Sequence, residues 1–275
     1  MVRKTLLLFA ALAAAGFAGP ASARTNLGGD GPVVSHGNVL TPDTGGPRVL
    51  YAPSESDDRG YRAQISAQIG GTCDYFDARV ATPSPTQLLN YDGVMTWANY
   101  YYFDNVGFGN ALADFVDRGG RVVLGAFCVY TSGSYVAGRL TTDTAHYCPV
   151  TGGFNHWSLS MWDGTDGGNC LYAGVTSLGD TYRDILTVVG PGAEYIGRFS
   201  DGEFADVGNA YGNVMYANGA GGYPLAPVGQ DAARVANAFV CGMIGWGGHT
   251  LATSVPVSLP SAGTMTWGGV KGLFQ

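Results

Sequence analysis

The sequence carries little charge and lacks the short motifs that mark nucleotide or serine-hydrolase chemistry. Lys, Arg, Asp and Glu make up only 13% of the 275 residues, and no basic cluster stands out. Nucleic acid and anionic membrane surfaces are therefore not expected as partners. There is no G-x-x-x-x-G-K-[ST] loop, no G-x-G-x-x-G after an apolar strand and no G-x-S-x-G. No cofactor and no serine nucleophile are predicted.

Cysteines are also few, and none forms a C-x-x-C pair, which argues against a metal knuckle or a thioredoxin-type motif. The sequence contains Cys73, Cys128, Cys148, Cys170 and Cys241. Five cysteines cannot all pair within one chain, so at least one is left over or pairs with another molecule. A disulfide between Cys148 and Cys170 is one hypothesis, because it would constrain the later part of the long polar segment over residues 131–168.

Long apolar runs are absent after the N-terminus. Arg3 and Lys4 precede an apolar run over residues 6–17, and a small-x-small site ends at Ala23. This is the pattern of a secretory signal peptide over residues 1–23, and the run is too short to span a membrane. We expect a secreted or periplasmic protein with no membrane span after cleavage, in a compartment that favours disulfides. Loss of the two basic residues lowers the formal net charge from −7 to −9.

What the sequence does contain is an alternation of strand and helix patterns over residues 48–128. Gly- and Pro-rich residues 24–47 form an extended lead-in, residues 48–244 one α/β domain, and residues 245–275 a tail or edge strand. Strand patterns occupy residues 48–53, 72–79, 93–97 and 121–126, and helical patterns occupy residues 59–69, 83–89 and 106–117. This rhythm predicts a mostly parallel sheet with right-handed crossovers.

The rhythm breaks after residue 130. Residues 131–168 show no strong period and are predicted to be a long loop excursion, which at this edge of a sheet is often a binding loop. Strand patterns resume at residues 185–189, 194–199 and 213–218 in a hairpin-like arrangement, and a helix is predicted over residues 231–244.

A resemblance to a known family lies in three consecutive stretches. These are YDGVMTW at residues 91–97, a helix ending in DRGG at residues 117–120, and RVVLGAF at residues 121–127. They resemble the class I glutamine amidotransferase-like superfamily, including its ThuA-type and other non-catalytic members. The resemblance implies a three-layer flavodoxin-like α/β domain with helices on both faces of the sheet. Fold alone does not imply function.

In catalytic members of that superfamily, the strand after the Gly-Gly turn ends in a nucleophilic cysteine on a tight turn. Cys128 stands at about that place, but residues 129–132 lack the glycine that such a turn requires. The family's triad is completed by His-x-Glu, and none of His146, His156 and His249 has a glutamate two residues later. The resemblance therefore implies a fold without a recognisable triad.

Two hypotheses for Cys128 remain open. It is the nucleophile of an extracytoplasmic hydrolase with His146 or His156 as base, or it is a disulfide half or a buried small residue. The two histidines have no third ligand at suitable spacing, so no metal site is predicted.

Ligands of open α/β sheets bind beyond the carboxyl ends of the strands, which directs attention to three loops. The first holds Glu55, Asp57 and Asp58, which either bind a ligand or simply cap the following helix. The others hold aromatic and amide side chains that suit sugars or peptides but also pack. The predicted ligand-binding residues are Glu55, Asp57, Asp58, Trp97, Asn99, Tyr100 and Tyr130. The leading hypothesis is a secreted, non-catalytic binding or structural module for carbohydrate or an extracellular protein.

Overall fold

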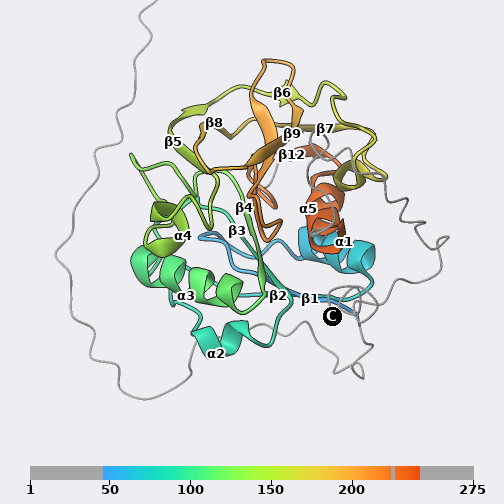
Figure 1. Cartoon of the computed structure of the whole chain (residues 1–275). Coiled ribbons are helices and arrows are strands. Elements are labelled where there is room, and N and C mark those ends of the chain that lie inside the picture. The colour runs from blue at the N-terminus through green and yellow to red at the C-terminus, as the bar shows by residue number, and fades with distance from the viewer. Residues whose placement is uncertain (1–45, 224–226, 242–275) are drawn as a thin grey trace, which may run out of the picture. The chain divides into compact units, whose positions relative to one another are not determined.

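The computed structural model describes residues 46–223 and 227–241, and all of them belong to one compact unit (Figure 1). The predicted signal peptide, nearly all of the lead-in and the tail over residues 245–275 lie outside the described residues. None of the helices in the described ranges combines the length and the apolar character needed to cross a membrane.

The core of the fold is a seven-stranded sheet in the order β2-β1-β3-β4-β11-β10-β9. Its strands are β1 Arg48–Tyr51, β2 Thr72–Tyr75, β3 Gly93–Thr96, β4 Arg121–Leu124, β9 Glu194–Arg198, β10 Phe204–Gly208 and β11 Val214–Ala217. The neighbours from β2 to β11 pair in parallel, and β10 pairs antiparallel with β11 and β9. All four residues of β4 are buried, as expected for a strand covered on both faces. The prediction of a mostly parallel α/β domain is confirmed.

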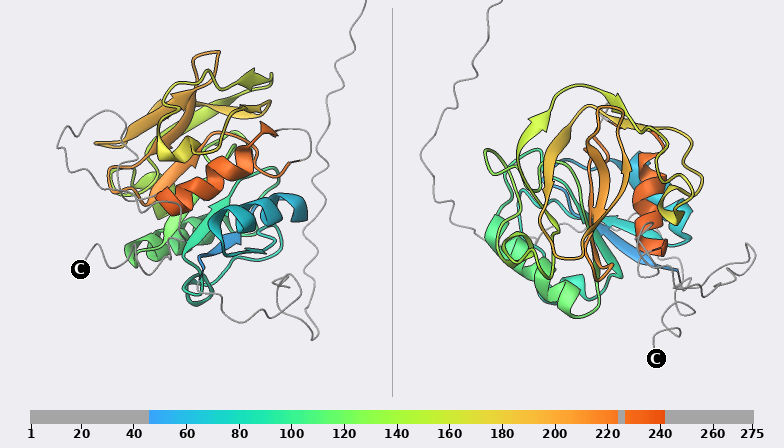
Figure 2. Two further views of the ribbon diagram at one scale, coloured as in Figure 1. Left: turned by 90° about the vertical axis from the view of Figure 1, so that its right-hand side faces the viewer. Right: turned by 45° about the horizontal axis from the view of Figure 1, so that its top comes forward.

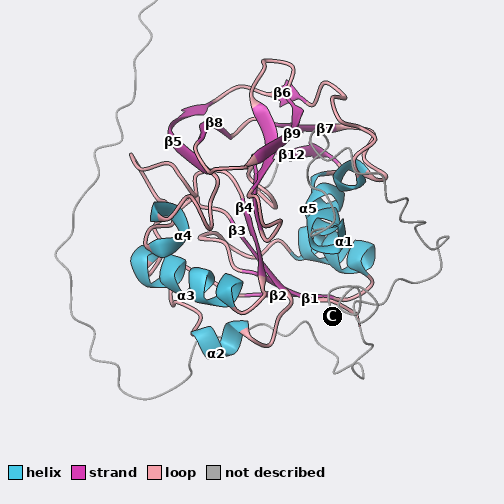
Figure 3. Ribbon diagram, viewed as in Figure 1, coloured by secondary structure: helices cyan, strands magenta, loops and turns pink. Residues whose placement is uncertain are grey.

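The helices begin and end at local signals that the sequence contains. They are α1 Arg59–Ile69, α2 Pro85–Leu88, α3 Asn105–Asp117, α4 Arg139–Thr142 and α5 Asp231–Cys241. The side chains of Asp58 and Asp104 cap α1 and α3 by accepting backbone N–H groups at 2.9 and 2.8 Å. Gly119 follows α3 with a φ of +88°, a conformation that glycine adopts without strain. Figures 1 and 3 show α3 on one side of β3 and β4, and α1 with α5 on the other.

The segment over residues 131–168 is not a structureless excursion, because it contains α4, β5 Val150–His156 and β6 Ser160–Met161. β5 pairs antiparallel with β8 Arg183–Val188. β6, β7 Leu178–Asp180 and β12 Pro227–Gly229 form a small antiparallel sheet. Figure 2 shows these strands grouped beyond one end of the parallel strands. Cross-strand pairing stabilises β5 although its two glycines weaken the local strand pattern.

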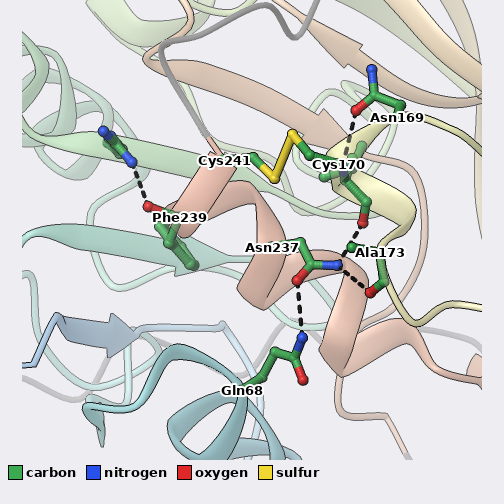
Figure 4. The surroundings of a disulfide bond; sticks show 9 residues. Gln68, Asn169, Cys170, Ala173, Asn237, Phe239 and Cys241 are labelled. Carbon is green, nitrogen blue, oxygen red and sulfur yellow. Dashed lines mark hydrogen bonds between the residues drawn. A yellow bond between two sulfur atoms is a disulfide. The ribbon is translucent and has the colours of Figure 1, made fainter. Parts of the chain in front are cut away.

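The disulfide joins Cys170 to Cys241, so the hypothesis of a Cys148–Cys170 bridge is wrong. Cys170 opens a short 3₁₀ turn, Cys170–Tyr172, that lies against α5 (Figure 4). Asn237 of α5 holds this turn because its Nδ2 donates to the carbonyl oxygens of Leu171 and Ala173, each at 2.9 Å. These contacts bring the two cysteine Cα atoms to 6.1 Å. Cys148 is instead a buried free thiol that donates to the Val150 carbonyl oxygen at 3.4 Å.

Candidate ligand-binding site

A tight turn over residues 125–128, here called the β4 elbow, follows the carboxyl end of β4. Gly125 permits it, since a Cβ there would lie 2.8 Å from the Trp97 Cβ and 2.9 Å from the Gly219 carbonyl oxygen. Phe127 adopts a φ of +67°, which costs an L-residue about 1–2 kcal/mol. Its N–H donates to Asp184 Oδ2 at 2.7 Å, which holds the strained conformation. The residue in the left-handed conformation is therefore phenylalanine, one position before Cys128.

Cys128 is the last residue of the β4 elbow, and its side chain is fully buried. Its Sγ is 3.6 Å from both the Tyr102 hydroxyl and the Thr96 carbonyl oxygen. Burial raises the pKa of the Cys128 thiol far above its ordinary value, so the thiol is neutral at physiological pH. A neutral, buried thiol is a poor nucleophile.

The two candidate bases have partners of their own. His146 lies in an exposed position with Nδ1 2.9 Å from the Asp143 carboxylate. His156 is on β5, with Nε2 3.1 Å from Glu203 Oε2. Among the described residues neither imidazole has a hydrogen bond to Cys128. The hydrolase hypothesis stays a prediction, and thiol labelling tests it.

An open cavity of about 340 Å³ lies at the β4 elbow. We call it the aromatic cavity. It is lined by Trp97, Asn99, Tyr100, Tyr101, Phe127, Tyr130, Gly133, Ser134, Trp157, Tyr182 and Tyr223. Four of these, Trp97, Asn99, Tyr100 and Tyr130, are predicted ligand-binding residues, and the fold brings them together because β3 and β4 end at the same edge. None of the lining residues carries a formal charge.

The rings of the aromatic cavity pack on one another and leave faces open. Trp157 stacks on Phe127 at 5.8 Å between ring centroids with 30° between the planes. Tyr182 meets Trp157 edge to face at 5.8 Å, and Tyr223 meets Tyr182 in the same way. Trp157 is 64% exposed. Such a surface offers flat apolar faces with hydroxyl groups at their edges.

The interior of the protein holds these rings in place. At the floor, the Trp97 indole N–H donates to the Tyr51 hydroxyl at 2.8 Å. Asp180 accepts the backbone N–H groups of Tyr182 and Ala220 at 2.7 and 2.8 Å. Asp184 accepts from Phe127, as described above. Burial raises the pKa of Asp180 and of Asp184 to about 7 in each case.

The three acidic residues of the loop after β1 have different partners. Glu55 reaches the aromatic cavity indirectly, because the Asn99 Nδ2 donates to its Oε2 at 2.5 Å. Asp57 instead accepts two hydrogen bonds from Arg62, at 2.6 and 2.8 Å, and Asp58 caps α1. All three line a separate open cavity of about 410 Å³. No group of three potential metal-ligating residues occurs among residues 46–223 and 227–241.

The cavity residues missing from the sequence-based prediction are Tyr101, Phe127, Gly133, Ser134, Trp157, Tyr182 and Tyr223. Tyr101 and Phe127 adjoin predicted strand ends, and extending those loops by a few residues would have included them. Trp157 follows β5 in a segment predicted to be a loop. Tyr182 and Tyr223 lie far from the other residues in sequence, and no local pattern marks them.

No protein-family model matches the sequence, and no curated protein matches it. Solved structures similar to this chain include a protein from Bacteroides uniformis described as ThuA-like. It is 12% identical with a TM-score of 0.46, over 74% of this chain and 94% of that one. A protein from Thermoplasma acidophilum described as a subunit of a GMP synthase is 7% identical with a TM-score of 0.47. The similarity covers 71% of this chain and 93% of that one.

A third is the carbohydrate deacetylase Agd3, 14% identical with a TM-score of 0.42, over 64% of this chain but only 29% of that protein. These likenesses concern the fold alone. The ThuA-like description of the first structure names one of the protein types that the sequence resembles.

Proposed function

We propose that this protein is a secreted, non-catalytic binding module whose aromatic cavity holds a neutral carbohydrate. The observation that carries the proposal is the set of uncharged aromatic rings at the carboxyl edge of the sheet. Aromatic faces pack against the apolar C–H faces of sugar rings, while hydroxyl and amide groups pair with the sugar hydroxyls. At about 340 Å³ the cavity is at the small end of ligand pockets.

The lining of the cavity supports binding rather than catalysis. The lining includes the Ser134 hydroxyl but no His, Lys, Asp or Glu that could act as its base, and no Cys. The Cys128 thiol at the β4 elbow is buried and neutral. The residue at the strained position is Phe127, whose phenyl ring lines the cavity and cannot act as a nucleophile.

Secretion and the domain limits belong to the same proposal. The N-terminal pattern over residues 1–23 is that of a cleaved signal peptide. The disulfide between Cys170 and Cys241 suits an oxidising compartment. The binding domain would extend over residues 48–244, with a tail over residues 245–275.

The test uses the protein over residues 24–275 and a panel of neutral hexasaccharides derived from cellulose, xylan, mannan and starch. Isothermal titration calorimetry measures binding, and urea denaturation measures stability. Trp157→Ala should weaken binding at least about fivefold, because stacked aromatic contacts contribute on the order of 1 kcal/mol or more. Its stability should change little, since the ring is 64% exposed.

Tyr211→Ala is the matched control. Tyr211 is 55% exposed and stacks on His146 outside the aromatic cavity. It should bind like the unmodified protein. Failure of every hexasaccharide to bind, or equal binding by the Trp157→Ala variant, would reject the carbohydrate proposal.

A further inference from the structure

We propose that Asn99 is the specificity-determining residue of the aromatic cavity, because Glu55 holds its amide so that Oδ1 faces the ligand as a fixed hydrogen-bond acceptor. The ligand must then bring a hydroxyl or N–H donor to this atom. The inference rests on the proposed function, and it selects a hydroxyl-bearing neutral sugar over acidic or O-methylated analogues.

Glu55 is held as an ionised group that only accepts hydrogen bonds. The residue is 6% exposed. Its Oε1 accepts the Ser56 N–H and hydroxyl at 2.6 and 2.7 Å, and Arg79 lies 3.7 Å away. Burial raises the pKa of Glu55, but hydrogen bonds from Asn99 and Ser56 and the charge of Arg79 outweigh burial and leave the pKa below its usual value.

The orientation of the Asn99 amide follows from this charge. A carboxylate accepts and never donates, so the Asn99 NH₂ group must face Glu55, and Nδ2 donates to Oε2 at 2.5 Å. The opposite orientation would set two acceptor oxygens against each other. The carbonyl oxygen of the amide is therefore the atom left on the other side.

The backbone prevents the Asn99 side chain from moving away. The Asn99 N–H donates to Ser54 Oγ at 3.2 Å, and the same hydroxyl donates to the Tyr100 carbonyl oxygen at 2.5 Å. Ser54 is fully buried. The loop after β3 is thus anchored to the loop after β1 on both sides of the Asn99 side chain.

Asn99 Oδ1 is open to the cavity. Asn99 lines the aromatic cavity. Within residues 46–223 and 227–241, Oδ1 accepts no hydrogen bond, and it is not among the fully buried polar atoms that lack a partner. It is therefore accessible to solvent and available to a ligand.

The other polar groups of the cavity discriminate less. The hydroxyls of the tyrosines and Ser134 rotate and serve as donor or acceptor as a ligand requires. Asn99 Oδ1 cannot do so while Glu55 is ionised. A ligand carboxylate or sulfate near Oδ1 would meet a second acceptor with the Glu55 charge behind it, and an ether oxygen would leave Oδ1 unpaired.

The experiment compares each neutral hexasaccharide of the panel with its fully O-methylated form, by calorimetry on the protein over residues 24–275. The unmodified protein should bind the free form at least about tenfold more tightly, as expected when the ligand covers an acceptor and leaves it unpaired. Glu55→Gln permits the Asn99 amide to turn and present Nδ2 to an ether oxygen. This variant should reduce the ratio to about threefold or less.

Two further variants keep the test decisive. Asp114→Asn changes a surface carboxylate that pairs with Arg139 and does not line the aromatic cavity, and it should leave the ratio unchanged. Asn99→Leu removes the acceptor and leaves Glu55 in place, so it should also reduce the ratio. It provides the test on its own if Glu55→Gln does not fold. Circular dichroism establishes folding of each variant.

The outcomes separate this inference from the proposed function. If the unmodified protein binds no hexasaccharide, the proposed function fails and the inference with it. If it binds the free and methylated forms equally, only the inference fails. The inference also fails if Glu55→Gln and Asn99→Leu keep the original ratio, because the methyl groups would then be excluded by their size alone.

Discussion

The left-handed conformation of Phe127 predicts an unusual order of stability for two substitutions at this position. Glycine normally destabilises a folded protein relative to alanine, because it loses more backbone freedom on folding. At Phe127 the φ of +67° reverses the comparison, since only glycine adopts this conformation without a steric cost. Phe127→Gly should therefore be more stable than Phe127→Ala.

The expected difference is the balance of two terms. Relief of the left-handed conformation favours glycine by about 1–2 kcal/mol. The greater freedom of the unfolded glycine chain favours alanine by about 0.4–1 kcal/mol. Glycine should retain an advantage of roughly 0.5–1 kcal/mol, or about 1–4 °C in Tm for a domain of this size. Both variants lose the same buried ring, so this loss cancels in the comparison.

Urea denaturation with a common m-value measures the difference, and Tyr130 supplies the control. Tyr130 also lines the aromatic cavity three residues further on and is not among the described residues with positive φ. Tyr130→Ala should be more stable than Tyr130→Gly. A Phe127→Ala variant as stable as Phe127→Gly would refute the claim that the left-handed conformation at this position has a steric cost.

Three further predictions concern the buried groups. The pKa of Asp184 is about 7 in the folded chain and about 3.9 in an unfolded one, so the native state binds the proton first. The contribution of protonated Asp184 to the free energy of unfolding should be greatest below pH 4 and be lost as the pH rises through 7. Asp184→Asn should flatten this pH dependence in urea titrations at several pH values. Cys128 should resist Ellman's reagent until the protein unfolds, and rapid labelling of the native protein would favour the hydrolase hypothesis. Arg234→Met should lower stability by about 3–5 kcal/mol in urea denaturation, because Asp206 and Asp231 would remain buried without their cation; a loss below about 1 kcal/mol would contradict this role.

The first half of the domain could be predicted closely from local patterns. The predicted helix over residues 59–69 matches α1, because Asp58 caps its first turn and apolar residues recur at helical spacing. The stretch over residues 121–124 forms the buried strand β4 that its unbroken apolar run indicates. Trp97, Asn99, Tyr100 and Tyr130 meet in one cavity because parallel strands end at one edge.

The second half was harder to predict for a physical reason. β5 has weak local propensity and forms through its pairing with β8. β10 was missed altogether; it pairs antiparallel with its neighbours between β9 and β11. Cys170 pairs with a cysteine 71 residues away once α5 packs against the turn it opens. β5 and the disulfide depend on contacts between residues distant in sequence, whereas β10 pairs with the strands directly before and after it and its local pattern was overlooked.

The sequence by itself determined the signal-peptide pattern, the order of strands and helices up to β4, and the edge of the sheet where a ligand site would form. These follow from periodicity, capping residues and strand direction, which act over a few neighbouring positions. Only the tertiary structure decided that Phe127 rather than Cys128 takes the strained position at the β4 elbow. It also decided that Glu55 turns the Asn99 amide toward a single orientation. Both depend on groups that are in contact only after the chain has folded, so no local sequence pattern indicates them.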